Sequence, residues 1–377
     1  MIKIAYIINQ LRRTGPVLVL RDIIQNLDRT KFKPLIIRLR KDDSTTSLAS
    51  VFELMGVEII GLNYSFMQLE LSTRKVSCSV DTILKKNDID IVHTHGYHPV
   101  LVASLLKSGI PTVETAHNIS AEDYIYSKGR FLGNYMNIRY LQQLERINHV
   151  AAISRTVQDF YSGKLNKPMI HVIYNGINTA GFKRSNPEAR RSLRKKFKIP
   201  LNSKVFLVIG VLNEIKDPKT IIEAYKRLFD GTDICAPFLL FLGAGPLMKK
   251  CRILASDYPR IQFNGFTQNV DEYLQMADWC ICASHSEGFG LNFMESLMSG
   301  VPVVSSDIAT FRELLEFYPV LKGYSFPAGD SVGLAQKMNS AMMTSINMIN
   351  IFEDVKVRFS ALTMAKKYMS LYEKMKI

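Results

Sequence analysis

Apolar residues along this chain occur in short blocks of strand length, and amphipathic segments of helical length separate many of them. The blocks predict strands at 2–8, 35–39, 89–93, 112–114, 150–154, 171–174, 205–211, 238–242, 261–263, 279–283 and 302–305. Helical patterns at 15–26 and 218–229 each follow a strand. This alternation predicts an α/β fold with parallel sheets. The continuous apolar run Ile2 to Ile8 is typical of a strand buried on both faces.

The composition changes after Gly181, where 183–199 is polar and basic and contains no clear core strand. We place a domain boundary there, giving a Rossmann-like domain at 1–182 and a second at 183–354. Two such domains would face each other across a cleft at the carboxyl ends of their strands. A C-terminal helix at about 355–377 would cover a domain and could pack back on the first one. Its predicted inner positions are Val355, Phe359, Leu362, Tyr368 and Leu371.

The formal net charge of +14 favours polyanionic partners. Basic residues gather before residue 42 and again at 190–196, without a zinc-finger, helix-turn-helix or RNA-recognition signature. We therefore expect no nucleic acid and favour an anionic membrane surface, with a solvated charged face as the alternative. No apolar run approaches the roughly 20 residues of a bilayer span. The expected location is cytoplasmic, peripheral on the inner face of the membrane.

The segment 284–304 carries the clearest chemistry. Gly288 and Gly290 precede a predicted helix at 291–299, so a glycine loop leads into a helix N-terminus. Free backbone N–H groups and the helix dipole make this an anion site suited to a diphosphate. Glu287 and Glu295 flank it, and carboxylates accept hydrogen bonds from sugar hydroxyls. Two carboxylates around a phosphate cradle match the layout of a nucleotide sugar.

This segment resembles the E-x₇-E signature of family 4 glycosyltransferases (glycosyl transferases group 1), which have the GT-B fold and retain anomeric configuration. The resemblance implies that Glu287 contacts the transferred sugar and Glu295 the ribose of the donor. It also places the donor along Gly288, Phe289, Gly290 and Leu291.

Further motifs extend the resemblance over nearly the whole chain. The loop 210–217 resembles the family's G-R-L…K-G turn, which implies that Lys216 neutralises the donor diphosphate. The segment 115–118, Thr-Ala-His-Asn, resembles the T-x-H-[DN] turn whose histidine reaches the transferred sugar, here His117. Val211 departs from the pattern, since the family commonly has Arg there.

Three weaker matches agree in order and spacing, and a fourth, at the N-terminus, has one glycine fewer than the family pattern. The segment 172–178 resembles the V-I-x-N-G-V-D run before the interdomain linker, 241–246 the G-x-G-P turn with Gly243, and 261–266 the strand and loop beside the base, with Phe266. At the N-terminus, Thr14-Gly15-Pro16 stands where the family has a Gly-Gly turn, so we expect Gly15 to line the cleft.

Two patterns suggest a metal, and neither is convincing. Asp88-Ile89-Asp90 lies at the start of a predicted strand, the wrong end for a site. His93, His95 and His98 have no acidic or Cys ligand at zinc-like spacing. We expect these histidines to line the acceptor side, His95 in particular, together with Arg12 and Arg13. No metal or cofactor is expected.

The resemblance implies a metal-independent hexosyltransferase. It would move a sugar, with retention, from a UDP-sugar to a lipid-linked saccharide in bacterial surface-polysaccharide synthesis. Two alternatives stay open: a UDP-sugar epimerase of GT-B fold, and a non-catalytic GT-B partner subunit, which Val211 would favour.

Overall fold

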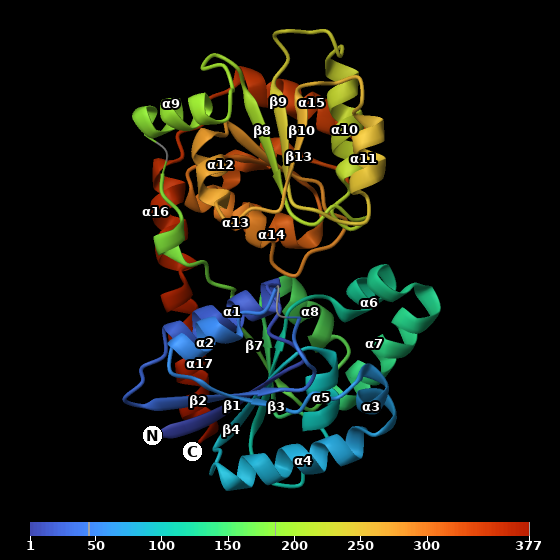
Figure 1. Cartoon of the computed structure of the whole chain (residues 1–377), viewed down its shortest axis with the longest axis vertical. Coiled ribbons are helices and arrows are strands. Elements are labelled where there is room, and N and C mark those ends of the chain that lie inside the picture. The colour runs from blue at the N-terminus through green and yellow to red at the C-terminus, as the bar shows by residue number, and fades with distance from the viewer. Residues whose placement is uncertain (44–45, 185, 377) are drawn as a thin grey trace. The chain divides into compact units, whose positions relative to one another are not determined.

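The computed structural model describes residues 1–43, 46–184 and 186–376, and the chain divides into two compact units (Figure 1). Unit 1 comprises Met1–Gly176 and Ala361–Ile377, and unit 2 comprises Ile177–Ser360. The sequence placed the first division after Phe182 and extended the last helix to Ile377, a residue outside the described ones. No helix in these ranges has the length and apolarity that a bilayer crossing needs.

Unit 1 contains, within the described residues, a seven-stranded parallel sheet in the order β3-β2-β1-β4-β5-β6-β7. Its strands are β1 (Ile2–Ile8), β2 (Phe32–Arg38), β3 (Glu58–Gly61), β4 (Ile91–His95), β5 (Thr112–Ala116), β6 (His149–Ala152) and β7 (Met169–Val172). Its helices are α1 (Gly15–Gln25), α2 (Ala49–Leu54), α3 (Phe66–Leu71), α4 (Thr73–Lys86), α5 (Tyr97–Ala103), α6 (Ser120–Lys128), α7 (Arg130–Leu144), α8 (Arg155–Ser162) and α17 (Ala361–Met375). The sequence did not predict β3, because its four residues are half exposed at the sheet edge.

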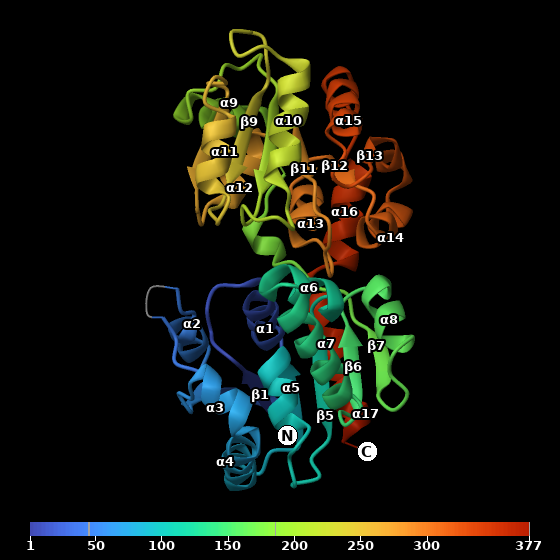
Figure 2. The same ribbon diagram turned by 90° about the vertical axis from the view of Figure 1, so that its right-hand side faces the viewer.

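Strand β1 shows how this sheet is covered. Its even-numbered residues, such as Tyr6, belong to the core formed with α1 and α17, and its alternate residues are buried on the other face. Figure 2 shows α17 on one face of the sheet and α5 and α7 on the other. Helix α17, the last in the sequence, is thus part of the first unit's core.

Unit 2 contains, in the part of the chain that is described, a six-stranded parallel sheet in the order β10-β9-β8-β11-β12-β13. Its strands are β8 (Val205–Ile209), β9 (Phe238–Leu242), β10 (Ile261–Gly265), β11 (Trp279–Cys282), β12 (Val303–Ser306) and β13 (Ser325–Phe326). Its helices are α9 (Pro187–Lys196), α10 (Pro218–Leu228), α11 (Met248–Leu254), α12 (Val270–Met276), α13 (Leu291–Met298), α14 (Ala309–Phe317), α15 (Ser331–Met343) and α16 (Ile349–Arg358). The predicted α/β fold with two parallel sheets is confirmed.

The C-terminal segment corrects the prediction of one continuous helix. It forms two helices, α16 and α17, which are separated at Phe359 and Ser360. Ile177 N donates a hydrogen bond to Phe359 O at 2.8 Å, and Ile177 pairs with Ser360 in a short parallel bridge. The helix stops there because this backbone pairs with another segment. Leu362, predicted to lie on an inner face, is 47% exposed.

The basic run at 190–196 also differs from a free charged face. It lies on α9, where Arg194 is only 2% exposed and donates to the carbonyls of Met276, Leu201 and Ser203. Both Arg190 and Arg194 form ion pairs with Asp278. Arg190 and Arg194 therefore hold α9 against the rest of unit 2.

Candidate functional site

The glycine loop of unit 2 connects β11 to α13, as predicted. Gly290 precedes α13 with φ of 79°, and a Cβ there would lie 2.6 Å from the ring of Phe311. Gly300 follows the helix with φ of 73°, a left-handed conformation that glycine favours after a helix. The first backbone N–H groups of α13 have no carbonyl acceptor within the helix, so this end of the helix is suited to an anion.

Glu287, in this loop, is held by partners on both its side chain and its backbone. Lys216 Nζ forms an ion pair with Glu287 Oε1, and Ser284 Oγ donates to the same oxygen at 2.8 Å. Thr310 Oγ1 donates to Glu287 O at 2.6 Å. The carboxylate is 13% exposed, so it is fixed at the surface of the loop. The sequence analysis missed Ser284 and Thr310, because neither belongs to a motif.

The loop that carries Lys216 is docked against the Glu287 loop. Asn213 Oδ1 accepts a hydrogen bond from Lys216 N at 3.0 Å, and His285 N donates to Ile215 O at 2.8 Å. His285 Nε2 lies 3.1 Å from Asp217 Oδ2, and the Asp217 side chain caps the N-terminus of α10. Two loops that are about 70 residues apart in sequence thus place a cation beside a carboxylate.

A second glycine turn packs under the Lys216 loop. A Cβ on Gly243, whose φ is 134°, would lie 2.0 Å from the carbonyl oxygen of Gly210. Val211, next in sequence to Gly210, is 52% exposed, and Phe266, just beyond β10, is 66% exposed. The close approach of the two turns therefore requires glycine, while the residues beside them remain accessible.

The other predicted donor residues lie in different surroundings. Glu295 is partly exposed on α13, and Leu291 is partly exposed at its start. Gly288 is buried, and Phe289 is 2% exposed with its ring 5.8 Å from that of Phe359. The Phe289 side chain is therefore part of the core.

Unit 1 has a cavity of about 320 Å³ at the carboxyl ends of its central strands. Its wall includes Ile8, Asn9, Gln10, Arg12, Thr14, Pro16, Val17, His95, Gly96, Tyr97, Glu114, Thr115, His117, Asn118, Asp123, Tyr124 and Tyr140. Of the predicted residues, His95, His117 and Arg12 line this cavity. Gly15 and Arg13 are not among its lining residues.

His95 and His117 contact each other in the cavity wall, with His95 Nδ1 2.9 Å from His117 Nε2. Burial lowers the pKa of His117 to about 3 and that of His95 well below its usual value. Both rings are therefore neutral at pH 7. Among the described residues, His95 Nε2 and Asn9 Oδ1 are buried without a hydrogen-bond partner. The wall thus offers polar atoms that a hydroxyl group could pair.

The other two histidines do not line the cavity, contrary to the prediction. His93 lies two residues before His95 on β4, where its nitrogens contact Tyr372 OH and Thr115 Oγ1, each at 2.7 Å. His98 lies on α5, with Nε2 2.9 Å from Glu70 Oε1. Only the last residue of β4, His95, reaches the carboxyl end of the sheet. This explains why His95 lines the cavity and His93 does not.

Glu114 is a feature that the sequence analysis did not identify. It is fully buried and accepts hydrogen bonds from Thr94 Oγ1 at 2.5 Å, Tyr140 OH at 2.8 Å and Gly96 N at 3.0 Å. Burial raises its pKa to about 8 despite these three donors. A carboxyl that is largely neutral at pH 7 therefore forms part of the cavity wall.

Among the described residues, no three His, Cys, Asp or Glu side chains are grouped so as to hold a metal ion. The glycine-rich loops with Lys216 lie in unit 2, and the cavity lined by histidine and tyrosine side chains lies in unit 1. Each unit thus has a site of distinct chemistry.

Two family models match this chain. Residues 14–180 match Glycosyltransferase Family 4, and residues 189–350 match Glycosyl transferases group 1. Together they cover most of the sequence, and each lies almost wholly within one unit.

Individual proteins resemble it over most or nearly all of its length. The O-antigen biosynthesis glycosyltransferase WclY of Escherichia coli is 23% identical, with 98% of each chain covered. N-acetyl-alpha-D-glucosaminyl L-malate synthase of Bacillus anthracis is 24% identical over 74% of this chain and 72% of its own.

Solved structures show the same fold. Sucrose-phosphate synthase from Thermosynechococcus elongatus superposes with a TM-score of 0.81 at 18% identity, over 100% of this chain and 99% of that one. Anabaena HepE, solved in complex with UDP and glucose, gives 0.78 at 18% identity over 99% and 100%. With both family models and the fold in agreement, this chain belongs to the group 1 glycosyltransferases of GT-B fold.

Proposed function

We propose that the protein transfers a hexose from a UDP-sugar to a lipid-linked saccharide acceptor in bacterial surface-polysaccharide synthesis. The observation that carries the donor half is the Lys216–Glu287 pair at the glycine loop of unit 2. UDP in a structural neighbour and O-antigen synthesis in a relative support the donor and the pathway.

Lys216 is suited to the departing diphosphate. The leaving UDP gains negative charge as the glycosidic bond breaks, so a fixed cation stabilises the transition state more than the ground state. An ammonium group has three N–H donors, and Glu287 uses one of them. Lys216 can therefore pair with Glu287 and with a phosphate oxygen at once.

Glu287 is suited to the hydroxyls of the transferred sugar, because its carboxylate is held in one position by Lys216 and Ser284. Glu295 on α13 would bind the ribose, and Phe266 would pack on the base. The family resemblance assigns His117 to the transferred sugar. It also implies retention of configuration without a metal ion.

The experiment is a panel of UDP- and GDP-sugars incubated with the protein, with both thermal shift and released nucleotide measured. We expect one UDP-sugar to raise the melting temperature and to be slowly hydrolysed, and Glu287→Gln to lower nucleotide release at least tenfold. Isomerised donor without nucleotide release would indicate an epimerase. If no donor shifts the melting temperature, the proposal is wrong and a binding subunit is favoured.

A further inference from the structure

Helices α6 and α7 of unit 1 expose an unusual group of apolar side chains. Phe131 is 93% exposed, Leu132 47%, Tyr135 54% and Ile138 56%. These four residues of α7, here called the outer stripe, have the spacing i, i+1, i+4 and i+7. They therefore share one face of the helix.

The opposite face of α7 is buried, so the outer stripe is not the result of a loosely packed helix. Gly133, Met136, Tyr140 and Leu144 are the buried residues of α7. A Cβ at Gly133 would lie 2.5 Å from the carbonyl oxygen of Tyr124, so α6 and α7 pack backbone to backbone there. Helix α7 thus carries two apolar faces, and only one of them has a partner among the described residues.

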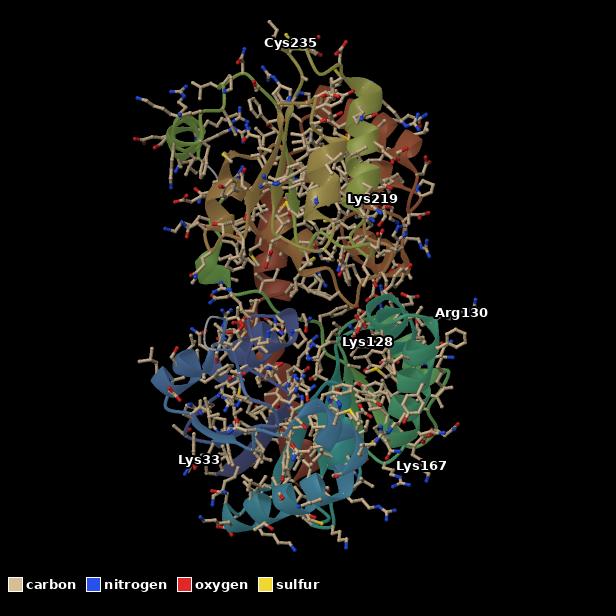
Figure 3. All side chains as sticks on the ribbon, turned by 45° about the vertical axis from the view of Figure 1, so that its right-hand side comes forward. Lys33, Lys128, Arg130, Lys167, Lys219 and Cys235 are labelled. Carbon is tan, nitrogen blue, oxygen red and sulfur yellow. The ribbon has the colours of Figure 1, made fainter. Side chains whose placement is uncertain are left out.

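The charged residues of α7 and of the turn before it are basic, whereas Glu122 and Asp123 lie in the first turn of α6. Helix α7 contains no acidic residue from Arg130 to Leu144. Lys128 and Arg130 flank Gly129 in the turn between the two helices, and both are exposed (Figure 3). This combination of exposed apolar and cationic side chains complements an anionic lipid surface.

The basic residues that first suggested a membrane partner are less available. In the N-terminal region Arg21 pairs with Asp22, and Arg38 with Asp42. Arg29 donates to the carbonyl of Met55. The early basic residues are therefore spread over several elements and partly neutralised, whereas Lys128 and Arg130 adjoin the apolar stripe.

Resting on the proposed function, we propose that the outer stripe inserts into the headgroup region of an anionic bilayer, with Lys128 and Arg130 pairing with lipid phosphates. Phe131, Leu132 and Ile138 supply the apolar contact, and Tyr135 suits the interface because its ring is apolar and its hydroxyl polar. Asp123 and Tyr124 of α6 and Tyr140 of α7 line the cavity of unit 1. The docked hairpin therefore holds that cavity next to the bilayer, where a lipid-linked saccharide is presented.

The test is flotation of the full-length protein with vesicles of phosphatidylcholine, alone or mixed with phosphatidylglycerol. We expect the wild type to float with the mixed vesicles and to be released by high salt. The triple variant F131S/L132S/I138S should lose about tenfold or more in vesicle binding. The control L54S/I234S/I253S replaces three apolar residues elsewhere that are 65–89% exposed, against 47–93% for the triple variant, and should float as the wild type does. K128S/R130S should lose the preference for the anionic vesicles.

Wild type that does not float, or a triple variant that floats unchanged, overturns the proposal. A dimer that the triple variant abolishes, without flotation of either protein, would make the stripe an interface between copies and overturns it too. Thermal shift with UDP-sugars on the same variants keeps this test apart from the proposed function. Flotation without any donor shift would refute the transferase, and a donor shift without flotation would refute only the membrane surface.

Discussion

The two units place their polar chemistry in opposite ways. In unit 2 it comes from two short loops, 210–217 and 284–290, which contact each other through the Lys216–Glu287 pair. In unit 1 it comes from single residues of many elements, such as Asn9, His95, Glu114 and Tyr140, which meet only at the sheet edge. The first arrangement leaves a continuous signature in the sequence, and the second does not.

The difference extends to electrostatics. The unit 2 loops expose a cation beside a carboxylate and a helix N-terminus, as an anionic ligand requires. The unit 1 cavity is walled by two neutral histidines and a carboxyl of raised pKa. Site-directed changes should therefore affect ligand chemistry in unit 2 and pH-dependent stability in unit 1.

The largest effect should come from Lys216→Ala, which removes the cation of unit 2. We expect turnover to fall by about 10²–10³, since removal of one group that stabilises transition-state charge typically costs that much. The control is Lys219→Ala, because Lys219 forms an exposed pair with Glu214, 2.9 Å away, in the same region. That variant should stay within about twofold of wild type, as exposed pairs contribute little. Equal losses in both variants would mean that Lys216 has no special role.

Next in size is the effect of Gly243→Ala on the packing of the two turns in unit 2. The new Cβ would lie 2.0 Å from Gly210 O at a φ of 134°, so the backbone must shift. We expect a loss of about 3 kcal/mol in the free energy of unfolding and weaker UDP binding. Gly265→Ala is the control, because its Cβ meets nothing within 4 Å although its φ is also positive. The measurement is denaturant unfolding of both variants. An equal loss in the free energy of unfolding would show that the contact between the two turns is unimportant.

These two loops explain why the sequence predicted unit 2 so well. Strand ends, the glycine positions and the cap at Asp217 are local features, and their spacing fixes the place of Lys216 and Glu287. Two strands were not predicted, β3 in unit 1 and β13 in unit 2. Of the cavity wall in unit 1, the sequence predicted His95, His117 and Arg12 but not Glu114. In the sequence Glu114 cannot be distinguished from other strand residues. Its partners Thr94, Gly96 and Tyr140 meet it only in the folded structure. The break between α16 and α17 was missed for the same reason, since it depends on Ile177.

Glu114→Gln tests the neutral cavity wall of unit 1 through its pH dependence. The folded-state pKa is raised to about 8 from a usual 4.5, so the folded carboxyl holds its proton where the unfolded one has lost it. Stability from this group is present below about pH 4.5 and is lost as the pH rises to 8. Glutamine keeps the shape and cannot ionise. We expect the stability of the variant relative to wild type to grow by about 3 kcal/mol between pH 5 and pH 8.

The measurement for Glu114→Gln is the melting temperature across pH 5 to 8. If the melting temperatures of wild type and variant change in parallel over this range, the raised pKa of Glu114 is contradicted, because its ionisation would then not destabilise the folded protein. Asp81→Asn serves as a comparison in the same unit. Asp81 accepts hydrogen bonds from the backbone of Lys107 and Ser108 near the surface. We expect Asp81→Asn to lower the melting temperature. It should not remove a decrease in melting temperature toward pH 8.

The smallest effect we predict concerns the link between the last helix and the first sheet. Tyr372 OH on α17 lies 2.7 Å from His93 Nδ1 and 3.2 Å from Tyr6 OH, all of them buried. Tyr372→Phe keeps the ring and leaves His93 and Tyr6 each short of a partner, so it should cost about 1–2 kcal/mol in the free energy of unfolding. Tyr318→Phe in unit 2, which removes one bond to the partly exposed Asp354, should cost less. If the two substitutions cost the same, then the fully buried bonds of Tyr372 in unit 1 are worth no more than the part-buried bond of Tyr318 in unit 2. The contrast between the units would then be one of sequence pattern and not of energy.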